Sequence, residues 1–275
     1  MAGRLFLVGT PIGNLGDISK RCAETLEEAD FIAAEDTRVS LKLLNHLGIK
    51  KPLVSYYEHN QAESGEKIVR RIEAGETCAL VTDAGMPAIS DPGEGLVKLC
   101  IERGIEVLAV PGPCAAVTAM AVSGLPSGRF TFEGFLSVTR KNRMEHLHSL
   151  KNEKRTMIFY EAPHKLKNTL DDLIDTFGGD RRIALCRELT KLHEETVRTT
   201  LSGAAELYRD AVVKGEFVLV VEGAPEDNTP ASMDNALEMV SRLRDGGASL
   251  KDAVKTVSEE LNIPKNELYK NALEM

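Results

Sequence analysis

The sequence predicts two α/β domains followed by a small helical tail, and three features of the chain lead to this prediction. In the first half, short runs of strand-forming residues alternate with helical patterns, which is typical of a mostly parallel sheet covered on both faces. In the second half, two strand candidates follow each other without room for a crossover helix, which predicts antiparallel pairing in a mixed sheet. Beyond a proline-containing linker only helical patterns remain. We therefore expect domains at 1–115, 116–225 and 229–275.

Runs rich in Val, Leu, Ile and Phe predict five strands in the first domain. They are Arg4–Val8, Asp30–Ala34, Pro52–Tyr56, Thr77–Thr82 and Ile105–Val110. Between them, apolar residues recur at helical spacing, as in 41–47 and 68–72. Two prolines and a glycine at 111–113 then interrupt the periodicity, so the first domain should end close behind them.

Strands and helices are also predicted for the second domain and the tail. The expected strands are Arg155–Tyr160, Arg182–Arg187, Glu195–Leu201 and Glu216–Glu222, and the expected helices of the domain are Lys165–Phe177 and Gly203–Val213. The expected helices of the tail are Met233–Asp245, Ser249–Leu261 and Pro264–Leu273. The last two are joined by a short turn, which gives them helix-turn-helix proportions. Apolar residues at 250, 253, 254, 257 and 261 predict one buried stripe.

Composition and charge limit the function classes. The net charge of −8 disfavours a general nucleic-acid coat protein, because phosphate neutralisation needs a positive surface. Five scattered cysteines without a C-x-x-C pair disfavour a disulfide framework or a zinc site, and we expect most of them to be buried. No apolar run approaches the roughly 20 residues of a membrane span. The start of the chain lacks a signal-peptide cleavage site, so we expect a cytoplasmic protein without membrane contact.

Three loops rich in glycine and proline follow strands of the first domain, at 8–17, 82–93 and 111–116. The first does not read G-x-G-x-x-G and has no lysine after its glycines, so it is neither a dinucleotide fingerprint nor a Walker A loop. The second contains two Pro, two Gly and two Asp, which is more special backbone than an ordinary turn needs. Because ligands bind outside the carboxyl ends of strands in open α/β sheets, the three loops together predict one ligand site.

Charged residues follow several other strands. Glu35, Asp36 and Arg38 follow the second strand, where they either contact a ligand or cap a helix. In the second domain, polar side chains stand at the ends of two strands, in the segments 159–165 and 187–191. We expect these side chains to face a cleft between the domains. His164, in the first of these segments, is more typical of a capping or surface residue, since no His or Cys partner lies at metal spacing. We therefore expect no metal site.

One segment of this acidic chain is basic. Residues 140–155 contain six Lys or Arg against two acids, together with two His. Such a run forms either a solvated helix face or a surface that binds phosphates, and the sequence leaves both readings open.

Seven motifs in this order resemble the tetrapyrrole (corrin/porphyrin) methylase superfamily: GTPIGNLGD, AEDTR, TDAGMPAISDPG, PGPCAA, FYEAPHK, CRELTK and GEFVLVVEG. The resemblance covers residues 4 to about 223. Within the superfamily, the chain is most similar to bacterial enzymes that methylate a cytidine ribose 2′-hydroxyl in 16S ribosomal RNA, and its tail resembles their small helix-turn-helix domain. The resemblance implies a two-domain tetrapyrrole-methylase-like fold with S-adenosylmethionine in the cleft between the domains. It also implies a homodimer whose substrate is 16S rRNA in the small ribosomal subunit.

Residues that match the motifs of the superfamily are implied to bind the cofactor. They are Pro11, Asp83, Ala84, Gly85, Met86, Ile89, Cys114, Ala115, Tyr160, Glu161 and Leu189. Two of these positions depart from the usual pattern. Met86 stands where Gly-Asp-Pro has its aspartate, and Cys114 replaces the serine or threonine before the alanine. Hydrogen bonds that those side chains would give must then come from the backbone.

The chemistry of methyl transfer suggests which residues act on the acceptor. A sulfonium methyl group is already electrophilic, so the enzyme must align a hydroxyl and help remove its proton, without need of a metal. Glu35, Asp36 and Glu188 are candidates for the base, with Arg38 or Lys191 holding a phosphate, and the sequence does not choose among them.

Two alternative functions remain open from the sequence. One is a carbon methyltransferase for corrins or porphyrins on the same scaffold. The other is a helix-turn-helix regulator with a domain that senses a cofactor. Residues 226–275 disfavour the regulator, because their six Lys or Arg against ten Asp or Glu give a poor footprint for duplex phosphates.

Overall fold

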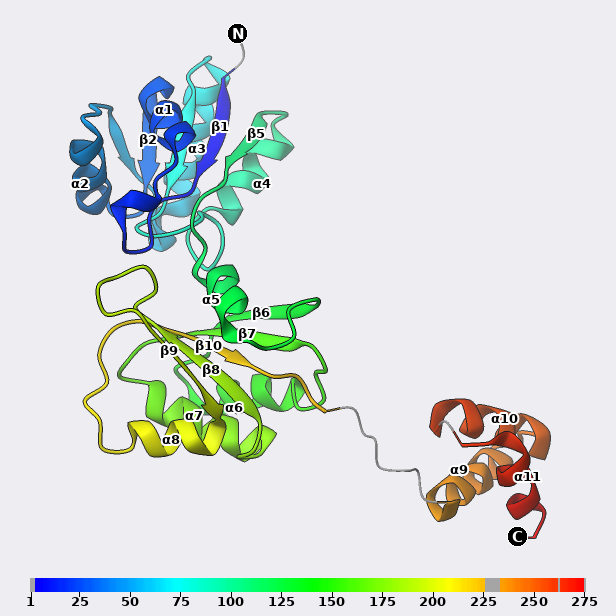
Figure 1. Cartoon of the computed structure of the whole chain (residues 1–275). Helices are drawn as coiled ribbons and strands as arrows, with labels where there is room; N and C mark the ends of the chain where they lie inside the picture. The colour runs from blue at the N-terminus through cyan, green and yellow to red at the C-terminus, as the bar shows by residue number, and fades with distance from the viewer. Residues whose placement is uncertain (1–2, 226–232, 262, 275) are drawn as a thin grey trace. The chain divides into compact units, whose positions relative to one another are not determined.

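A computed structural model describes residues 3–225, 233–261 and 263–274, and it divides the chain into two compact units, 1–224 and 225–275. The first unit contains two five-stranded sheets, and helices make up the second unit (Figure 1). The predicted α/β class with a helical tail is therefore confirmed. The boundary expected after residue 115 coincides with the start of α5 (Ala115–Ser123), and its role as a border between two domains stays a prediction.

The first sheet is parallel throughout, with strand order β3-β2-β4-β1-β5. Its strands are β1 (Arg4–Val8), β2 (Phe31–Ala34), β3 (Leu53–Ser55), β4 (Cys78–Val81) and β5 (Glu106–Val110), each within one residue of the predicted bounds. The four residues of β2 and of β4 are all buried, as expected for central strands covered on both faces.

Helices cover both faces of this sheet. They are α1 (Lys20–Glu28), α2 (Thr37–Leu47), α3 (Gln61–Glu73) and α4 (Glu94–Glu102), with short 3-10 helices η1 (Leu15–Asp17) and η2 (Glu58–Asn60). Ile68 and Ile72 of α3 pack with Leu96 of α4 on one face. Leu26 of α1 and Leu44 of α2 belong to the core cluster on the other face. Four of the five cysteines are buried in the first unit, which confirms the expectation for most of them.

The second sheet is mixed, with strand order β6-β7-β10-β8-β9. Its strands are β6 (Phe130–Phe135), β7 (Thr156–Glu161), β8 (Arg182–Arg187), β9 (Glu195–Thr200) and β10 (Phe217–Val221). Only β6 and β7 pair in parallel, and the predicted antiparallel pairing of β8 with β9 is confirmed. The last strand of the unit, β10, thus lies at the centre of its sheet.

Helix α5 packs on one face of this sheet, and three helices pack on the other. These are α6 (Arg140–Ser149), α7 (Leu166–Phe177) and α8 (Leu201–Tyr208). The prediction for α8 was wrong in its bounds, because Thr200 accepts a hydrogen bond from Gly203 N at 3.2 Å and so caps a helix that begins two residues earlier than expected. Strand β6 was not predicted, since Gly134 (φ +63°) produces a register shift in its pairing with β7.

The second unit has a core of its own. Its helices are α9 (Met233–Asp245), α10 (Leu250–Leu261) and α11 (Lys265–Leu273). Ala253, Val254 and Val257 of the predicted stripe are buried, and Leu250 and Leu261 pack against them. Among the described residues, no helix has both the length and the apolar character that crossing a membrane requires.

Candidate active site

The three loops predicted to form one site meet at the carboxyl ends of β1, β4 and β5. Gly9 N donates to Val110 O at 3.0 Å, which joins the first loop to the end of β5. Thr10 and Gly85 exchange two backbone hydrogen bonds of 2.9 and 3.1 Å, and the Thr10 hydroxyl donates to Thr82 O at 3.1 Å. These contacts fix the loop that follows β4 against the loop that follows β1.

Two glycines make the approach of the first and third loops possible. A Cβ added to Gly112 would lie 2.8 Å from Gly9 Cα, and one added to Gly9 would lie 2.7 Å from Gly112 Cα and from the Met86 sulfur. Real Cβ atoms do not approach backbone so closely, so each position requires glycine for space alone.

A cavity of about 570 Å³ opens between these loops and the second sheet. This volume is in the range of small-molecule sites. Eleven of the residues predicted from the sequence line it: Glu35, Asp83, Ala84, Gly85, Met86, Ile89, Cys114, Ala115, Tyr160, Glu161 and Leu189. Five predicted residues do not line it: Pro11, Asp36, Arg38, Glu188 and Lys191. Pro11 precedes Ile12, which does face the cavity.

Glu35 and Asp36 are adjacent in sequence but have different environments. Glu35 faces the cavity and accepts a hydrogen bond of 2.7 Å from the Thr82 hydroxyl. Asp36 is the N-cap of α2, and its carboxylate pairs with the Arg38 guanidinium at 2.6 Å. The hydrogen bonds from Arg38 lower the pKa of Asp36 to about 2. Of the two roles left open by the sequence, capping therefore describes Asp36.

Glu188 and Lys191 form part of a second ionic group. Lys191 Nζ lies 2.8 Å from Glu188 Oε1 and 2.8 Å from Glu216 Oε2. The hydrogen bond from Lys191 holds the pKa of Glu188 below its usual range. A Cβ on Gly13 would overlap the Lys191 side chain, so this group borders the first loop. Both candidates are engaged with neighbouring residues at the edge of the site.

Tyr160 and Glu161 are the last two residues of β7 in the second sheet, and both line the cavity. The Tyr160 hydroxyl accepts a hydrogen bond of 3.1 Å from Ala116 N at the start of α5, and burial raises its pKa to about 12. Glu161 is 2% exposed and accepts hydrogen bonds from Ala162 N at 2.8 Å and Thr169 Oγ1 at 2.5 Å. The contact between Tyr160 and Ala116 holds the start of α5, with Cys114 and Ala115, at the cavity wall.

Sequence reasoning missed half of the cavity wall. The missed residues are Ile12, Ser90, Asp91, Phe135, Ala162, Pro163, His164, Cys186, Glu216, Phe217 and Val218. Asp91 and His164 stand inside motifs that were recognised, so the motif as a whole was the signal for them. Phe135 belongs to the unpredicted strand β6, and nothing in its sequence surroundings indicated a role. His164 is exposed, as expected, but it faces the cavity.

Comparison with known proteins identifies the family. The profile of the tetrapyrrole (corrin/porphyrin) methylases matches residues 4–205. The chain belongs to this family. Membership confirms the predicted fold and the predicted class of enzyme, a methyltransferase that uses S-adenosylmethionine. Over 97% of its length this methylase is 48% identical to ribosomal RNA small subunit methyltransferase I of Halalkalibacterium halodurans, covering 93% of that protein. It is 45% identical to the protein of the same name from Synechocystis sp., over 99% of this chain and 98% of that one.

Solved structures agree on the fold of the methylase. Diphthine synthase superposes with a TM-score of 0.61 at 16% identity, covering 80% of this chain and 90% of that one. Uroporphyrin-III-C-methyltransferase from Thermus thermophilus gives a TM-score of 0.57 at 18% identity, covering 79% of this chain and 94% of that one. At these identities the likeness concerns the fold alone.

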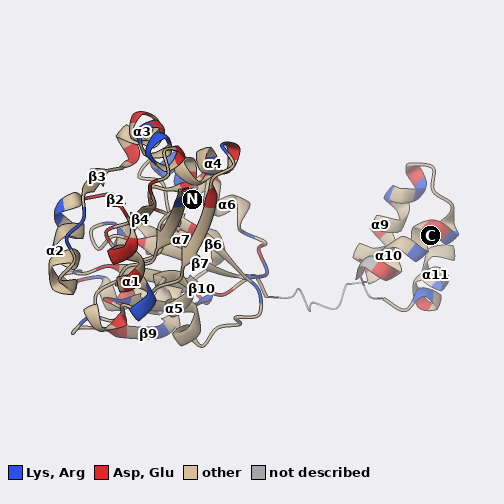
Figure 2. Cartoon of the chain, turned by 90° about the horizontal axis from the view of Figure 1, so that it is seen from above, with Lys and Arg blue, Asp and Glu red and all other residues tan. Residues whose placement is uncertain are grey.

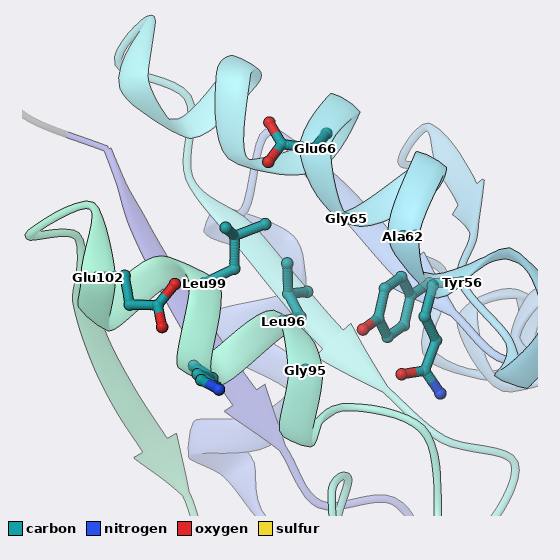
Figure 3. Close-up of a pocket in the computed structure, with 10 residues that line it drawn as sticks. Tyr56, Ala62, Gly65, Glu66, Gly95, Leu96, Leu99 and Glu102 are labelled. Carbon is teal, nitrogen blue, oxygen red and sulfur yellow. The ribbon is translucent and has the colours of Figure 1, made fainter.

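A second cavity, of about 440 Å³, lies between α3 and α4 of the methylase (Figure 3). Tyr56, Leu96 and Leu99 line it, with the carboxylates of Glu66 and Glu102 toward one end. It lies between two of the helices that cover one face of the first sheet rather than at the carboxyl ends of the strands, where ligands bind in α/β folds. None of the residues selected from the sequence line it.

The basic stretch 140–155 is less available for phosphates than its composition indicates. Asp172, only 4% exposed, pairs with Arg143 at 2.7 Å and with Arg140 at 3.0 Å. Arg143 is itself 12% exposed and also donates to Ser137 O at 3.0 Å. Arg155 pairs with Glu153 at 2.6 Å. Arg143 therefore fits neither of the two readings of this stretch, because it is largely buried and joins α6 to α7 through Asp172.

Proposed function

We propose that this methylase transfers the methyl group of S-adenosylmethionine to the 2′-hydroxyl of a cytidine ribose in 16S ribosomal RNA of the small subunit. One observation carries the proposal: relatives named for small-subunit ribosomal RNA match this chain at 42–48% identity over nearly its full length, tail included. The structures of carbon methyltransferases cover only about four fifths of the chain, at identities of 20% or less. These matches favour the ribosomal acceptor over a corrin or porphyrin.

The residues of the first cavity fit the proposed cofactor. Ala84, Gly85 and Ala115 have small or absent side chains, so their backbone can approach a ligand closely. Ile12 and Leu189 offer apolar surface to an adenine ring, and the carboxylate of Asp83 complements a cationic ligand. We assign cofactor binding to the ten residues of the cavity wall that the resemblance implied for it, which leaves Glu35 outside this set. When bound, S-adenosylmethionine supplies a methyl group activated by its positive sulfur, and the chain supplies alignment.

A basic surface that starts near the cavity and follows α2 to the opposite edge of the first sheet fits an RNA backbone, and we assign phosphate binding to it. The segment 37–57 contains four Lys or Arg, at 38, 42, 50 and 51, and no Asp or Glu. Arg38, Lys42 and His46 recur every fourth residue along α2 and are exposed. Figure 2 shows blue without red along α2, whereas α1 and α3 carry both colours. Asp36 is the N-cap of α2, and the preceding residue, Glu35, lines the cavity. The first turn of α2, with Arg38, is therefore the part of this surface nearest to the cavity.

The acceptor is tested by supplying the methylase with small ribosomal subunits that lack the modification, together with labelled S-adenosylmethionine. We expect label in one cytidine ribose of 16S rRNA, located by mass mapping of nuclease fragments. Label transferred to a corrin or porphyrin, with none in the RNA, would instead favour the carbon methyltransferase.

Replacing Lys42, Lys50 and Lys51 together with alanine should weaken binding to small subunits and flatten its salt dependence. Each lost phosphate contact should lower the slope of log K against log salt by about 0.7–0.9. The affinity for S-adenosylmethionine, measured by calorimetry, should not change. The matched control replaces Lys141, Lys151 and Lys154 of the basic stretch. A flattened slope in the control, with a wild-type slope in the first variant, would place the RNA on the stretch 140–155 instead.

We propose further that the methylase works in the cytoplasm as a homodimer. Large apolar side chains remain exposed on the first unit, among them Val138, Leu192 and Val212 at 76%, 93% and 82%. The dimer is proposed from the resemblance to the superfamily, and an interface that covered these side chains would remove their apolar surface from water. Sedimentation of the purified chain should give twice the mass of 30.0 kDa, and a monomer at micromolar concentration would contradict the dimer.

A further inference from the structure

The structure selects one carboxyl group that none of the sequence reasoning singled out. We propose that Asp91 accepts the proton of the acceptor hydroxyl during methyl transfer. The proposal rests on the function proposed above, and it assigns the base among the acidic residues around the site.

The position of Asp91 is defined by a loop with unusual backbone conformations. Ala88 and Ser90 have φ angles of +67° and +63°, which side-chain-bearing residues rarely adopt. A Cβ added to Gly93 would lie 2.9 Å from Ala88 N, so the end of the loop is folded back on its middle. The loop is held between the Thr10–Gly85 bridge and the start of α4. This backbone places Asp91 in the wall of the first cavity.

The other candidates for the base are engaged in ion pairs or in a hydrogen bond with neighbouring side chains. Asp36 caps α2 and is paired with Arg38, and Glu188 is paired with Lys191. Neither lines the cavity, and carboxylates held ionised by a cation are weak bases. Glu35 does line the cavity, but its Oε2 atom accepts from the Thr82 hydroxyl at 2.7 Å.

The surroundings of Asp91 favour a proton on it. Burial and the nearby carboxylates of Glu35 and Asp83 raise the pKa of Asp91 to about 6, although the neighbouring Thr82 hydroxyl opposes the shift. The Thr82 hydroxyl has a single proton and donates it to Glu35 Oε2 at 2.7 Å, so it does not donate to Asp91 at the same time. A base that titrates near 6 is ionised at neutral pH and is still strong enough to take part in proton transfer.

The proposed step balances as follows. The 2′-O–H bond breaks and its proton moves to a carboxylate oxygen of Asp91. The ribose oxygen forms a bond to the methyl carbon, while the bond from that carbon to the sulfonium sulfur breaks and its electron pair stays on sulfur. The products are a methoxy ribose, neutral S-adenosylhomocysteine and a protonated Asp91, which then loses its proton to water.

Several other titratable groups face the same cavity. Glu35 and Asp83 come from the first sheet. The second sheet and the segments beside it contribute Tyr160, Glu161, His164 and Glu216, together with the thiols of Cys114 and Cys186. An imidazole ordinarily titrates close to neutrality, so the test must separate Asp91 from His164.

The test compares single-turnover methylation of small subunits by the wild type and by Asp91→Asn. The variant should be slower by about 10²- to 10⁴-fold at neutral pH, the usual contribution of a positioned base. Its calorimetric affinity for S-adenosylmethionine should stay within about tenfold of the wild type, because the amide keeps the size of the side chain. Asp91→Glu should recover part of the rate. Glu94→Gln, an exposed acid three residues further on, serves as the matched control and should keep the wild-type rate.

The pH profile provides a readout that a structural role would not change. Between pH 5 and 8 the wild-type rate should rise with an apparent pKa near the value of about 6 given for Asp91. Asp91→Asn should lose this rise, and His164→Gln should keep it whatever its own rate. A near wild-type rate for Asp91→Asn, or a rise lost in His164→Gln and kept in Asp91→Asn, would overturn the proposal while leaving the proposed function intact. A wild type that does not methylate small subunits would overturn both.

Discussion

Replacing Asp172 with alanine is expected to lower the free energy of unfolding by about 3–5 kcal/mol, the usual cost of removing one partner from a buried ion pair. The carboxylate of Asp172 is 4% exposed and pairs with both Arg143 and Arg140. After the substitution Arg140, at 67% exposure, can turn to solvent, but Arg143, at 12%, keeps a buried charge without its carboxylate. Urea denaturation at constant pH measures the loss.

Asp175 provides the matched control for this prediction. It lies on the same helix, is 63% exposed, and contacts Arg140 only at 3.7 Å. Asp175→Ala should change the free energy of unfolding by no more than about 0.5 kcal/mol, as surface substitutions usually do. If Asp172→Ala is as stable as this control, the pair with Arg143 does not fasten α6 to α7.

Gly112→Ala should damage the proposed cofactor site from a position that does not line it. The new methyl group would lie 2.8 Å from the Cα, C and O atoms of Gly9, so the first and third loops must separate. Overpacking of this kind costs about 1–3 kcal/mol. Because the loops can relax apart in the free variant and must close again around the ligand, this cost falls on the binding step, and affinity for S-adenosylmethionine should drop by about 5- to 150-fold.

Calorimetry and thermal unfolding together test this prediction. Gly128→Ala is the control, because a Cβ at Gly128 has no neighbour within 4 Å and the substitution should leave both measurements unchanged. Wild-type affinity and melting temperature in Gly112→Ala would show that the two loops can move apart freely, contrary to the close packing of their glycines.

Patterns that repeat along the chain were sufficient to predict most of the fold. Each strand of the first sheet is a continuous apolar run, as in Cys78–Val81, because both of its faces are buried. Strand β6 has no such pattern: Glu133 faces His146 at 2.9 Å, and Gly134 shifts its register. Its pairing with β7 depends on contacts between residues that are distant in sequence, and the local composition of β6 does not indicate them.

The site was predictable as a set of loops but not as a set of roles. Both Asp83 and Asp91 stand in one motif, yet only the fold shows that Asp83 is exposed whereas Asp91 is more enclosed. The basic stretch gives the same lesson, since the partner of Arg143 is a buried aspartate 29 residues away. Charge is visible in a sequence, whereas the burial and pairing that decide its use are not.

The central place of β10 in the second sheet has a consequence for synthesis of the chain on the ribosome. The first sheet is complete once residue 110 has been made, but β7 and β8 lack their shared neighbour until residues 217–221 have emerged. Until then both strands present unpaired backbone along an edge, a feature that favours association with other chains. Phe217 and Val218 also line the cavity. A nascent chain therefore cannot form the complete cavity before nearly all of the first unit has been translated.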